Sequence, residues 1–407
     1  MHETFAPTLA AAQARIAAVQ PAAYARTRNA LGGAVSRLSP YITHGFVTLG
    51  DVLAGVDAKH PLDMQHKFVI ELGWRAYFRH VWQHQGDRIL YSLREGPLPD
   101  NVYATELPAD IRQACTGVPV VDEAVRTLYA TGMLHNHARM WLASYVVHVR
   151  KVHWRAGADW LYGHLLDGDL ASNHLSWQWV AGTGSSKPYL FNADNVARYA
   201  PAPWHSPGSV VDQSYEALDE LARQMPRLPR PGRAAQLEGT PTLEVTTEPS
   251  LLTEPPDDLG FTPPQAVAVA GCDVWLVHPW SMGARPDTLS VDTLVVAVFV
   301  SEFHNCWPWS AQRWQFVGSR MAELASHRWH GDAAAIAEAL KGARSVRSIA
   351  ELHLDPKLAQ WAHCQAAPAL FAQVDRPCSS FSQWWNRVSR GLDSAAELLS
   401  TQRGAAW

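Results

Sequence analysis

The stretch Asp167-Gly-Asp-Leu-Ala-Ser-Asn-His-Leu-Ser-Trp-Gln-Trp179 combines two acids, a neutral amide and two indoles. Such a set suits the binding of an aromatic, redox-active ring better than it suits hydrolysis. The chain also has 18 tryptophans in 407 residues, more than core packing ordinarily uses. Because tryptophan is large, polarizable and easily oxidised, the first hypothesis is a flavin site.

Length and composition set the class of protein. With 407 residues, 47% of them hydrophobic, the chain can bury a large core and form two or three domains. No apolar run is long enough to cross a bilayer and the N-terminus lacks a secretory signal, so we expect a cytoplasmic protein. The 5 cysteines are scattered, and none is part of a Cys-x-x-Cys pair. We therefore expect neither a disulfide framework nor a metal site.

Charge is unevenly distributed along the chain. The formal net charge is −4, to which residues 1–200 contribute +2 and residues 201–407 contribute −6. The charge pattern leaves open whether Arg150, Lys151 and Arg155 form a basic face for nucleic acid or only a solvated helix surface.

Two composition regimes predict an α plus α/β fold. Residues 1–225 read as an all-α domain, with helical periodicity over 61–85, 117–129 and 134–154. Residues 226–264 are rich in proline and read as an extended, partly disordered linker. In residues 265–407, strand-like runs at 274–277, 293–300 and 346–349 alternate with helical stretches at 310–325 and 332–340. This alternation predicts a small Rossmann-like domain with a parallel sheet, followed by a helical tail.

Five motifs, in order over residues 24–200, resemble the helical FAD-binding domain of the DNA photolyase and cryptochrome family. Besides the opening stretch they are Ser36-Arg-Leu-Ser-Pro-Tyr41, Glu71-Leu-Gly-Trp-Arg75, Thr116-Gly-Val-Pro-Val-Val-Asp122 and Thr131-Gly-Met-Leu-His-Asn-His-Ala-Arg-Met140. One such motif alone would be weak evidence.

The resemblance implies that the chain binds FAD. Hydroxyl and backbone groups at a helix start suit pyrophosphate oxygens, and a neutral amide at the flavin N5 edge leaves room for the fully reduced, anionic ring. Ordinary helix caps and core salt bridges would look the same in sequence. The implied FAD-binding residues are Tyr24, Ser36, Arg37, Leu38, Ser39, Arg75, His135, Arg139, Asp167, Asp169 and Asn173.

The resemblance further implies an electron path and a substrate. Trp177 matches the indole nearest the flavin and Trp154 the next one outward, while the third position has only Tyr103 nearby, and another aromatic exit is equally possible. The substrate would be DNA containing pyrimidine dimers, because a flipped dimer needs aromatic faces and polar groups to read it. The residues implied to contact it are Glu71, Trp74, Asn136, Met140 and Trp179.

Several departures from the family pattern keep alternatives open. Ala76, His137 and Met133 replace a usual acid, arginine and tryptophan. Light-dependent dimer repair is the favoured activity; a blue-light sensor or a light-independent FAD- or DNA-binding scaffold are the alternatives. The sequence does not set the oligomeric state.

The order of the domains is the largest departure. Residues 266–354 resemble the α/β domain that normally precedes the FAD-binding domain, so we expect a circular permutation. Pro279-Trp-Ser-Met-Gly283 stands where the family has an arginine-rich stretch, which makes an antenna chromophore doubtful and leaves a structural role for this domain.

Overall fold

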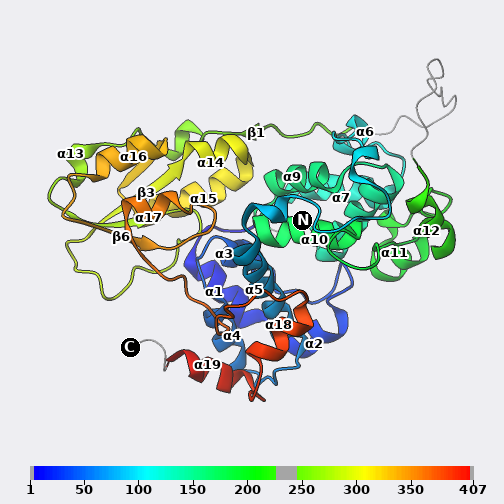
Figure 1. Ribbon diagram of the computed structural model, residues 1–407, viewed down its shortest axis with the longest axis horizontal. Helices are drawn as coiled ribbons and strands as arrows, with labels where there is room; N and C mark the ends of the chain where they lie inside the picture. Colours follow the sequence, from blue (N-terminus) through cyan, green and yellow to red (C-terminus); the bar gives the residue numbers. More distant parts are fainter. Residues whose placement is uncertain (1–3, 226–244, 404–407) are drawn as a thin grey trace.

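The computed structural model describes residues 4–225 and 245–403. Its N-terminal part is helical and its C-terminal part contains a small α/β domain, as predicted (Figure 1). The helices of the first part are α1 (Leu9–Ala18), α2 (Pro21–Thr27), α3 (Ser39–Thr43), α4 (Leu49–Asp57), α5 (Lys67–Gln85), η1 (Gly86–Leu90), η2 (Asp100–Val102), α6 (Ala109–Arg112), α7 (Pro119–Thr131), α8 (Asn136–Ser144), η3 (Tyr145–Val149), α9 (Trp154–His164), α10 (Leu170–Ala181), α11 (Ala193–Tyr199), η4 (Ala202–Trp204) and α12 (Tyr215–Arg223).

The stretch 134–154, with its predicted helical periodicity, is helical over 136–149 but does not form one continuous helix. Helix α8 ends at Ser144, continues as the π-helical turn η3, and gives way to the separate helix α9. Lys151 lies between them with φ of 54°, a left-handed conformation that a right-handed helix cannot contain. The ring of His153 then caps α9 by accepting a hydrogen bond from the backbone of Arg155.

The C-terminal part contains a five-stranded parallel sheet in the order β5-β3-β2-β6-β7. The strand order reverses at β2, the first of the five along the chain, as in doubly wound folds. The prediction of a small parallel sheet is therefore confirmed. The elements are β1 (Leu251–Leu252), η5 (Asp257–Leu259), α13 (Ala266–Val269), β2 (Asp273–Val277), β3 (Leu294–Val300), α14 (Ser301–Cys306), β4 (Trp309–Ser310), α15 (Ala311–Leu324), β5 (His327–Gly331), α16 (Ala333–Leu340), β6 (Ser345–Ile349), α17 (Lys357–Trp361), β7 (His363–Gln365), α18 (Phe381–Val388) and α19 (Ala395–Arg403).

Helix α10 lies between two hydrophobic clusters. Leu170 and Leu175 belong to a cluster that joins the first helices, the sheet and the tail, whereas Trp177 and Val180 belong to a second cluster within the helical part. A helix buried on two sides carries apolar residues all round. This explains why the opening stretch has no amphipathic pattern and makes α10 the centre of the fold.

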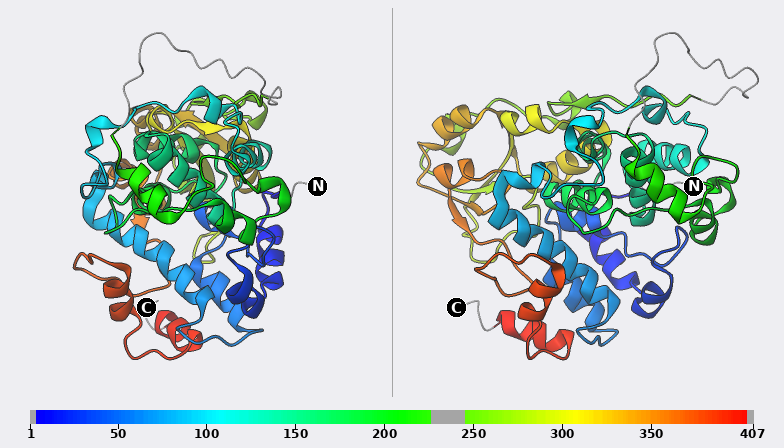
Figure 2. Two further views of the ribbon diagram at one scale, coloured as in Figure 1. Left: turned by 90° about the vertical axis from the view of Figure 1, so that its right-hand side faces the viewer. Right: turned by 45° about the vertical axis from the view of Figure 1, so that its right-hand side comes forward.

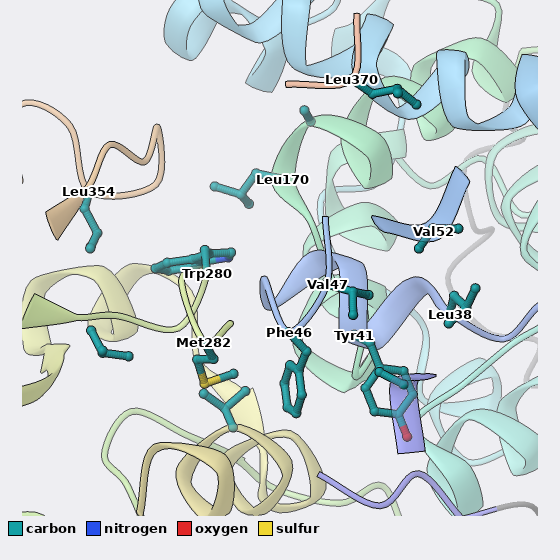
Figure 3. Close-up of a cluster of buried hydrophobic side chains, with 14 of the residues drawn as sticks. Leu38, Tyr41, Phe46, Val47, Val52, Leu170, Trp280, Met282, Leu354 and Leu370 are labelled. Atoms are coloured by element: carbon teal, nitrogen blue, oxygen red, sulfur yellow. The ribbon is translucent and has the colours of Figure 1, made fainter. Parts of the chain in front are cut away.

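The helical part and the α/β domain share the first of these clusters. Phe46 of the helical part stacks on Phe316 of α15, with ring centroids 5.2 Å apart. Figure 3 shows Phe46 and Tyr41 in the same cluster as Trp280 and Met282 of the α/β domain. The two parts are thus joined by a common core.

The C-terminal tail returns to the first helices. Helix α18 packs on α5 and α19 packs on α4, away from the sheet (Figures 1 and 2). Gly73 makes the α18 contact fit, because a Cβ at that position would lie 2.5 Å from the ring of Trp385. We propose that the tail be grouped with the helical part, which modifies the expected division at residue 265.

Only part of the expected linker can be described. Residues 226–244 lie outside the described residues. In the remainder, Glu248 pairs with Arg112 at 2.8 Å and β1 pairs with β4, so this segment contacts both parts of the molecule. Within residues 4–225 and 245–403, no helix combines the length and the apolar composition needed to span a membrane.

A buried histidine behind α10 predicts a loss of stability in acid. Nε2 of His148, in η3, donates to the carbonyl oxygen of Val180 at 2.9 Å. Burial is the main cause that lowers its pKa, from 6.5 to about 4; the charge of Lys151 adds to it and the Val180 hydrogen bond opposes it. Below pH 6.5 the unfolded chain therefore binds a proton that the folded chain does not. The free energy of unfolding decreases as the pH is lowered from 6.5 to about 4.

The expected loss from this one group is about 3 kcal/mol between pH 6.5 and 4. It is measured by urea unfolding of wild type and His148→Gln across that range, and the variant should show the shallower dependence. His363→Gln, at an exposed position, is the control and should keep the wild-type slope. Equal slopes for His148→Gln and wild type would contradict the prediction.

Candidate active site

The site is built around a turn of two acids between α9 and α10, which we call the acid turn (residues 166–169). Asp169 is the N-cap of α10 and accepts a hydrogen bond from the backbone of Ser172 at 2.8 Å. Asp167 is buried, and its two carboxylate oxygens lie 2.8 and 2.9 Å from Nη2 of Arg139 on α8. The helix cap and the ion pair together fix both carboxylates in place.

Both acids are held in the ionised form. Burial alone would raise the pKa of Asp167, but Arg139 and the Ser39 hydroxyl outweigh it and lower the pKa. Burial likewise opposes ionisation of Asp169, and the guanidinium of Arg75 is the largest of the causes that lower its pKa. Arg75 in turn donates to the hydroxyl of Thr43. The acid turn therefore presents two negative charges, each beside an arginine.

A pocket of about 190 Å³ lies beside the acid turn and opens to solvent between α5, α8 and α10. It brings together residues that are far apart in the sequence. Those that line it and that the resemblance implied are Glu71, Trp74, Arg75, Asn136, Arg139, Met140, Asp167, Asp169, Asn173 and Trp177.

Two buried side chains form the inner wall of the pocket. The amide nitrogen of Asn173 donates to the carbonyl oxygen of Ala158 at 2.8 Å, and this hydrogen bond fixes the side chain in the wall. The ring of Trp177 packs against Gly157 of α9, where a Cβ would lie 2.4 Å from it. Gly157 is thus the reason that Trp177 fits at this depth.

The mouth of the pocket is formed by α5. Glu71 is 41% exposed and lies 3.4 Å from Nε of Arg28. Trp74 stacks on Phe381 of the tail, with centroids 4.0 Å apart and ring planes 9° apart. Since Phe381 does not itself line the pocket, it supports the indole of Trp74 from outside.

The structure does not bring Trp179 into the pocket. A helix turns about 100° per residue, so a residue two positions after Trp177 lies on roughly the opposite side of α10. Trp179 is 41% exposed, and its ring lies 5.6 Å from that of Tyr189. Trp74 thus lines the pocket and Trp179 does not, and their pairing as stacking walls stays a prediction.

Six further residues that the resemblance implied to bind FAD do not line this pocket. Leu38 is fully buried in the core, so only its backbone is available to a ligand. Ser39 begins α3 and its hydroxyl bonds Asp167. His135 caps α8, and Tyr24 packs on Phe68 with centroids 5.4 Å apart. The last two are the half-buried Ser36 and the exposed Arg37, whose φ is 52°.

Two rows of rings lead outward from Trp154, which is buried against α10 and donates to the hydroxyl of Ser92 at 2.9 Å. In one row the ring of His153 lies 5.6 Å from Trp154 and 6.3 Å from Tyr103. In the other, His174 lies 6.3 Å from Trp154 and 5.4 Å from Trp307. Sequence reasoning missed Trp307, because it comes from the α/β domain.

A second cavity, of about 1120 Å³, lies between the helical part and the α/β domain. It shares Arg75 and Asp169 with the pocket, and its far wall includes Trp280 and Glu351, which follow β2 and β6. Both lie where the strand order reverses, the usual ligand position in open parallel sheets. Sequence reasoning missed Glu351, although its place just after a strand was a usable signal. Among the described residues, no three His, Cys, Asp or Glu side chains are grouped to hold a metal ion.

Comparison with known proteins identifies the helical part. Residues 68–202, which contain α5 to α11 and the whole pocket, match the family model of the FAD binding domain of DNA photolyase. This stretch of the chain is therefore similar to the FAD-binding domain of the DNA photolyase and cryptochrome family. The residues of the pocket fit the FAD of that family, because the ionised acids lie beside arginines and a buried, uncharged amide lines the same pocket.

Among photolyase relatives, a deoxyribodipyrimidine photo-lyase of Streptomyces griseus is 38% identical over 154 residues, 38% of this chain and 33% of that protein. A photo-lyase of Halobacterium salinarum is 31% identical over 228 residues, 48% of this chain and 46% of that protein. A cryptochrome DASH of Gloeobacter violaceus is 33% identical over 172 residues, 40% of this chain and 34% of that protein.

The chain therefore aligns with between a third and a half of the length of these relatives. A solved cryptochrome structure from Synechocystis sp. is 28% identical, with a TM-score of 0.44; the match covers 49% of this chain and 44% of that chain.

Proposed function

We propose that this chain uses reduced FAD and light to split cyclobutane pyrimidine dimers in DNA. The main observation in support is that ten of the implied site residues line one pocket, with the carboxyl group of Glu71 and the indole of Trp74 at its mouth. Relatives named deoxyribodipyrimidine photo-lyase support the same activity. Bound and reduced, the flavin would supply an electron on absorbing light and take it back once the cyclobutane ring has opened.

The residues of the pocket have separate proposed roles. Asp167 and Asp169, with their arginines, hold the cofactor and keep water from the inner wall. The amide of Asn173 carries no charge, so it does not oppose a reduced, anionic ring. At the mouth, Trp74 offers an aromatic face to a flipped dimer, and Glu71 and Asn136 offer hydrogen bonds to its base edges. Trp179, on the outer surface, is left to stack on neighbouring bases of the strand.

We also propose that Trp177 and Trp154 relay an electron from the surface to the pocket. The row through His153 to Tyr103 and the row through His174 to Trp307 both remain candidates for the outer end. The ring of Trp307 lies 5.2 Å below the guanidinium of Arg155, and a positive charge at that place disfavours an oxidised indole. This contact favours Tyr103 over Trp307 as the outer end of the electron relay.

The test is a repair assay on an irradiated oligothymidylate, with the FAD-loaded chain reduced by dithionite under anaerobic conditions. Under blue light we expect the absorbance of intact thymine to return, and in the dark we expect no change. Trp154→Phe is the matched control, because Trp154 does not line the pocket, chemical reduction bypasses the electron relay, and repair should therefore remain. Bound, reduced flavin without repair in the light would reject the proposal and favour a light sensor.

A further inference from the structure

A buried arginine of the α/β domain lies directly behind the acid turn. Arg313, on α15, has no exposed surface. Its Nη1 donates to the carbonyl oxygen of Tyr162 at 3.2 Å, and its Nη2 donates to that of Gly168 at 2.5 Å. Its guanidinium also lies 4.0 Å from the ring centroid of Trp309. These hydrogen-bond partners are neutral, and a buried cation is costly unless an opposite charge lies near it.

The opposite charges come from the acid turn itself. Gly168, which Arg313 contacts, is flanked by Asp167 and Asp169. Burial lowers the pKa of Arg313, and the carboxylates of these two acids are among the causes that oppose it. The acid pair therefore has Arg75 and Arg139 on the pocket side and a third cation, Arg313, on the α/β side.

The contact also explains the glycine in the opening stretch. A Cβ at position 168 would lie 2.4 Å from Nη1 of Arg313 and 2.7 Å from the carbonyl oxygen of Tyr162. No side chain fits there while the guanidinium keeps its place. The middle residue of Asp-Gly-Asp is thus set by an arginine of another domain.

Two histidines hold the same turn on either side of this contact. The ring nitrogens of His44 lie 2.9 Å from the carbonyl oxygen of Leu166 and 2.7 Å from that of Pro279. Nε2 of His353 lies 4.0 Å from a carboxylate oxygen of Asp169, and its ring stacks on Trp280 at 4.2 Å. The α/β domain therefore contacts the acid turn directly at Gly168 and Asp169, and it reaches Leu166 through His44 of the helical part.

We propose that Arg313 is a positioning residue of the flavin site, which makes the α/β domain a required part of that site. It fixes the acid turn from behind and balances its charge, so FAD binding depends on the docking of the α/β domain. The flavin consequences rest on the proposed function, whereas the contact with the acid turn does not.

The matched pair of variants is Arg313→Met and Arg320→Met. Arg320 lies seven residues further along α15, is also buried, and donates to Met282 at 3.1 Å instead of to the acid turn. Arg313→Met removes two charge-assisted hydrogen bonds, so we expect its Kd for FAD to rise about tenfold or more. Loss of a nearby positive charge should also make the flavin midpoint potential more negative. Arg320→Met should leave both quantities unchanged.

Two further variants keep the test decisive. Arg313→Lys keeps the positive charge but loses the planar guanidinium that reaches both carbonyl oxygens. It should therefore restore the wild-type midpoint potential, while FAD binds more weakly than in the wild type. If Arg313→Met does not fold, Gly168→Ala disturbs the same contact from the other side and should also weaken FAD binding.

Hydrogen exchange gives a readout that needs no flavin. In the apo chain, Arg313→Met should speed amide exchange in residues 166–173, and Arg320→Met should not. Unchanged FAD affinity and unchanged exchange in Arg313→Met would overturn the inference and leave the proposed function intact. A wild-type chain that binds no FAD would instead reject the proposed function, while the exchange comparison would still decide the role of Arg313.

Discussion

Asp167→Ala is expected to abolish FAD binding and to lower the free energy of unfolding by about 3 kcal/mol. The carboxylate of Asp167 accepts two hydrogen bonds from Arg139 and one from Ser39. Its removal leaves the half-buried guanidinium of Arg139 without its counter-charge, and breaking a largely buried pair from one side is strongly destabilising. The same change removes one of the two acids that we propose orient the cofactor.

The measurement combines urea unfolding of the apo chain with a titration of FAD followed by flavin fluorescence. Asp219→Ala is the matched control: it removes an acid from an exposed ion pair with Arg223 and should cost less than about 1 kcal/mol with FAD binding intact. Wild-type FAD affinity in Asp167→Ala would contradict the role assigned to the acid turn.

Glu71→Ala is expected to slow dimer repair about a hundredfold at saturating DNA, which is typical for the loss of one group that stabilises charge in a transition state. The carboxyl group stands at the mouth of the pocket, where the base edge of a flipped dimer would lie. Its pair with Arg28 is partly exposed, so stability should change by less than about 1 kcal/mol. FAD binding should be unaffected.

Glu71→Gln separates hydrogen bonding from the carboxyl group itself. The amide keeps the shape, still accepts through its oxygen and gains N–H donors, so we expect it to recover most of the repair rate. The rates are measured under single-turnover illumination, with equal flavin content in all three proteins. A Glu71→Ala chain that repairs at the wild-type rate would show that Glu71 does not act on the dimer.

How far the sequence predicts this fold depends on which contacts are local. The strands β2 and β3 follow from short apolar runs with β-branched residues, and β6 follows from the strand-like run 346–349. The edge strands β5 and β7 were not predicted, because His-Arg-Trp-His-Gly and His-Cys-Gln are short and polar. An edge strand is identified by its neighbour in the sheet, and single-sequence patterns do not contain that neighbour.

The candidate site likewise has a part that the sequence predicts and a part that depends on contacts between distant residues. The motifs on α5, α8 and α10 predicted most of the pocket, because the resemblance carries their three-dimensional arrangement with it. Trp179 is not among the residues that line the pocket, and its role at the substrate stays a prediction. Arg313 contacts Gly168 from 145 positions away, and no local pattern marks such a partner. The circular permutation of the two domains stays a prediction.

The measurement that tests the central claim most directly is the binding of FAD to the purified apo chain. The protein is mixed with excess FAD, separated from free cofactor by gel filtration, and its flavin absorbance is compared with its protein concentration. We predict one FAD per chain in the wild type and none in Asp167→Ala. A folded wild-type chain that elutes without flavin would contradict the account.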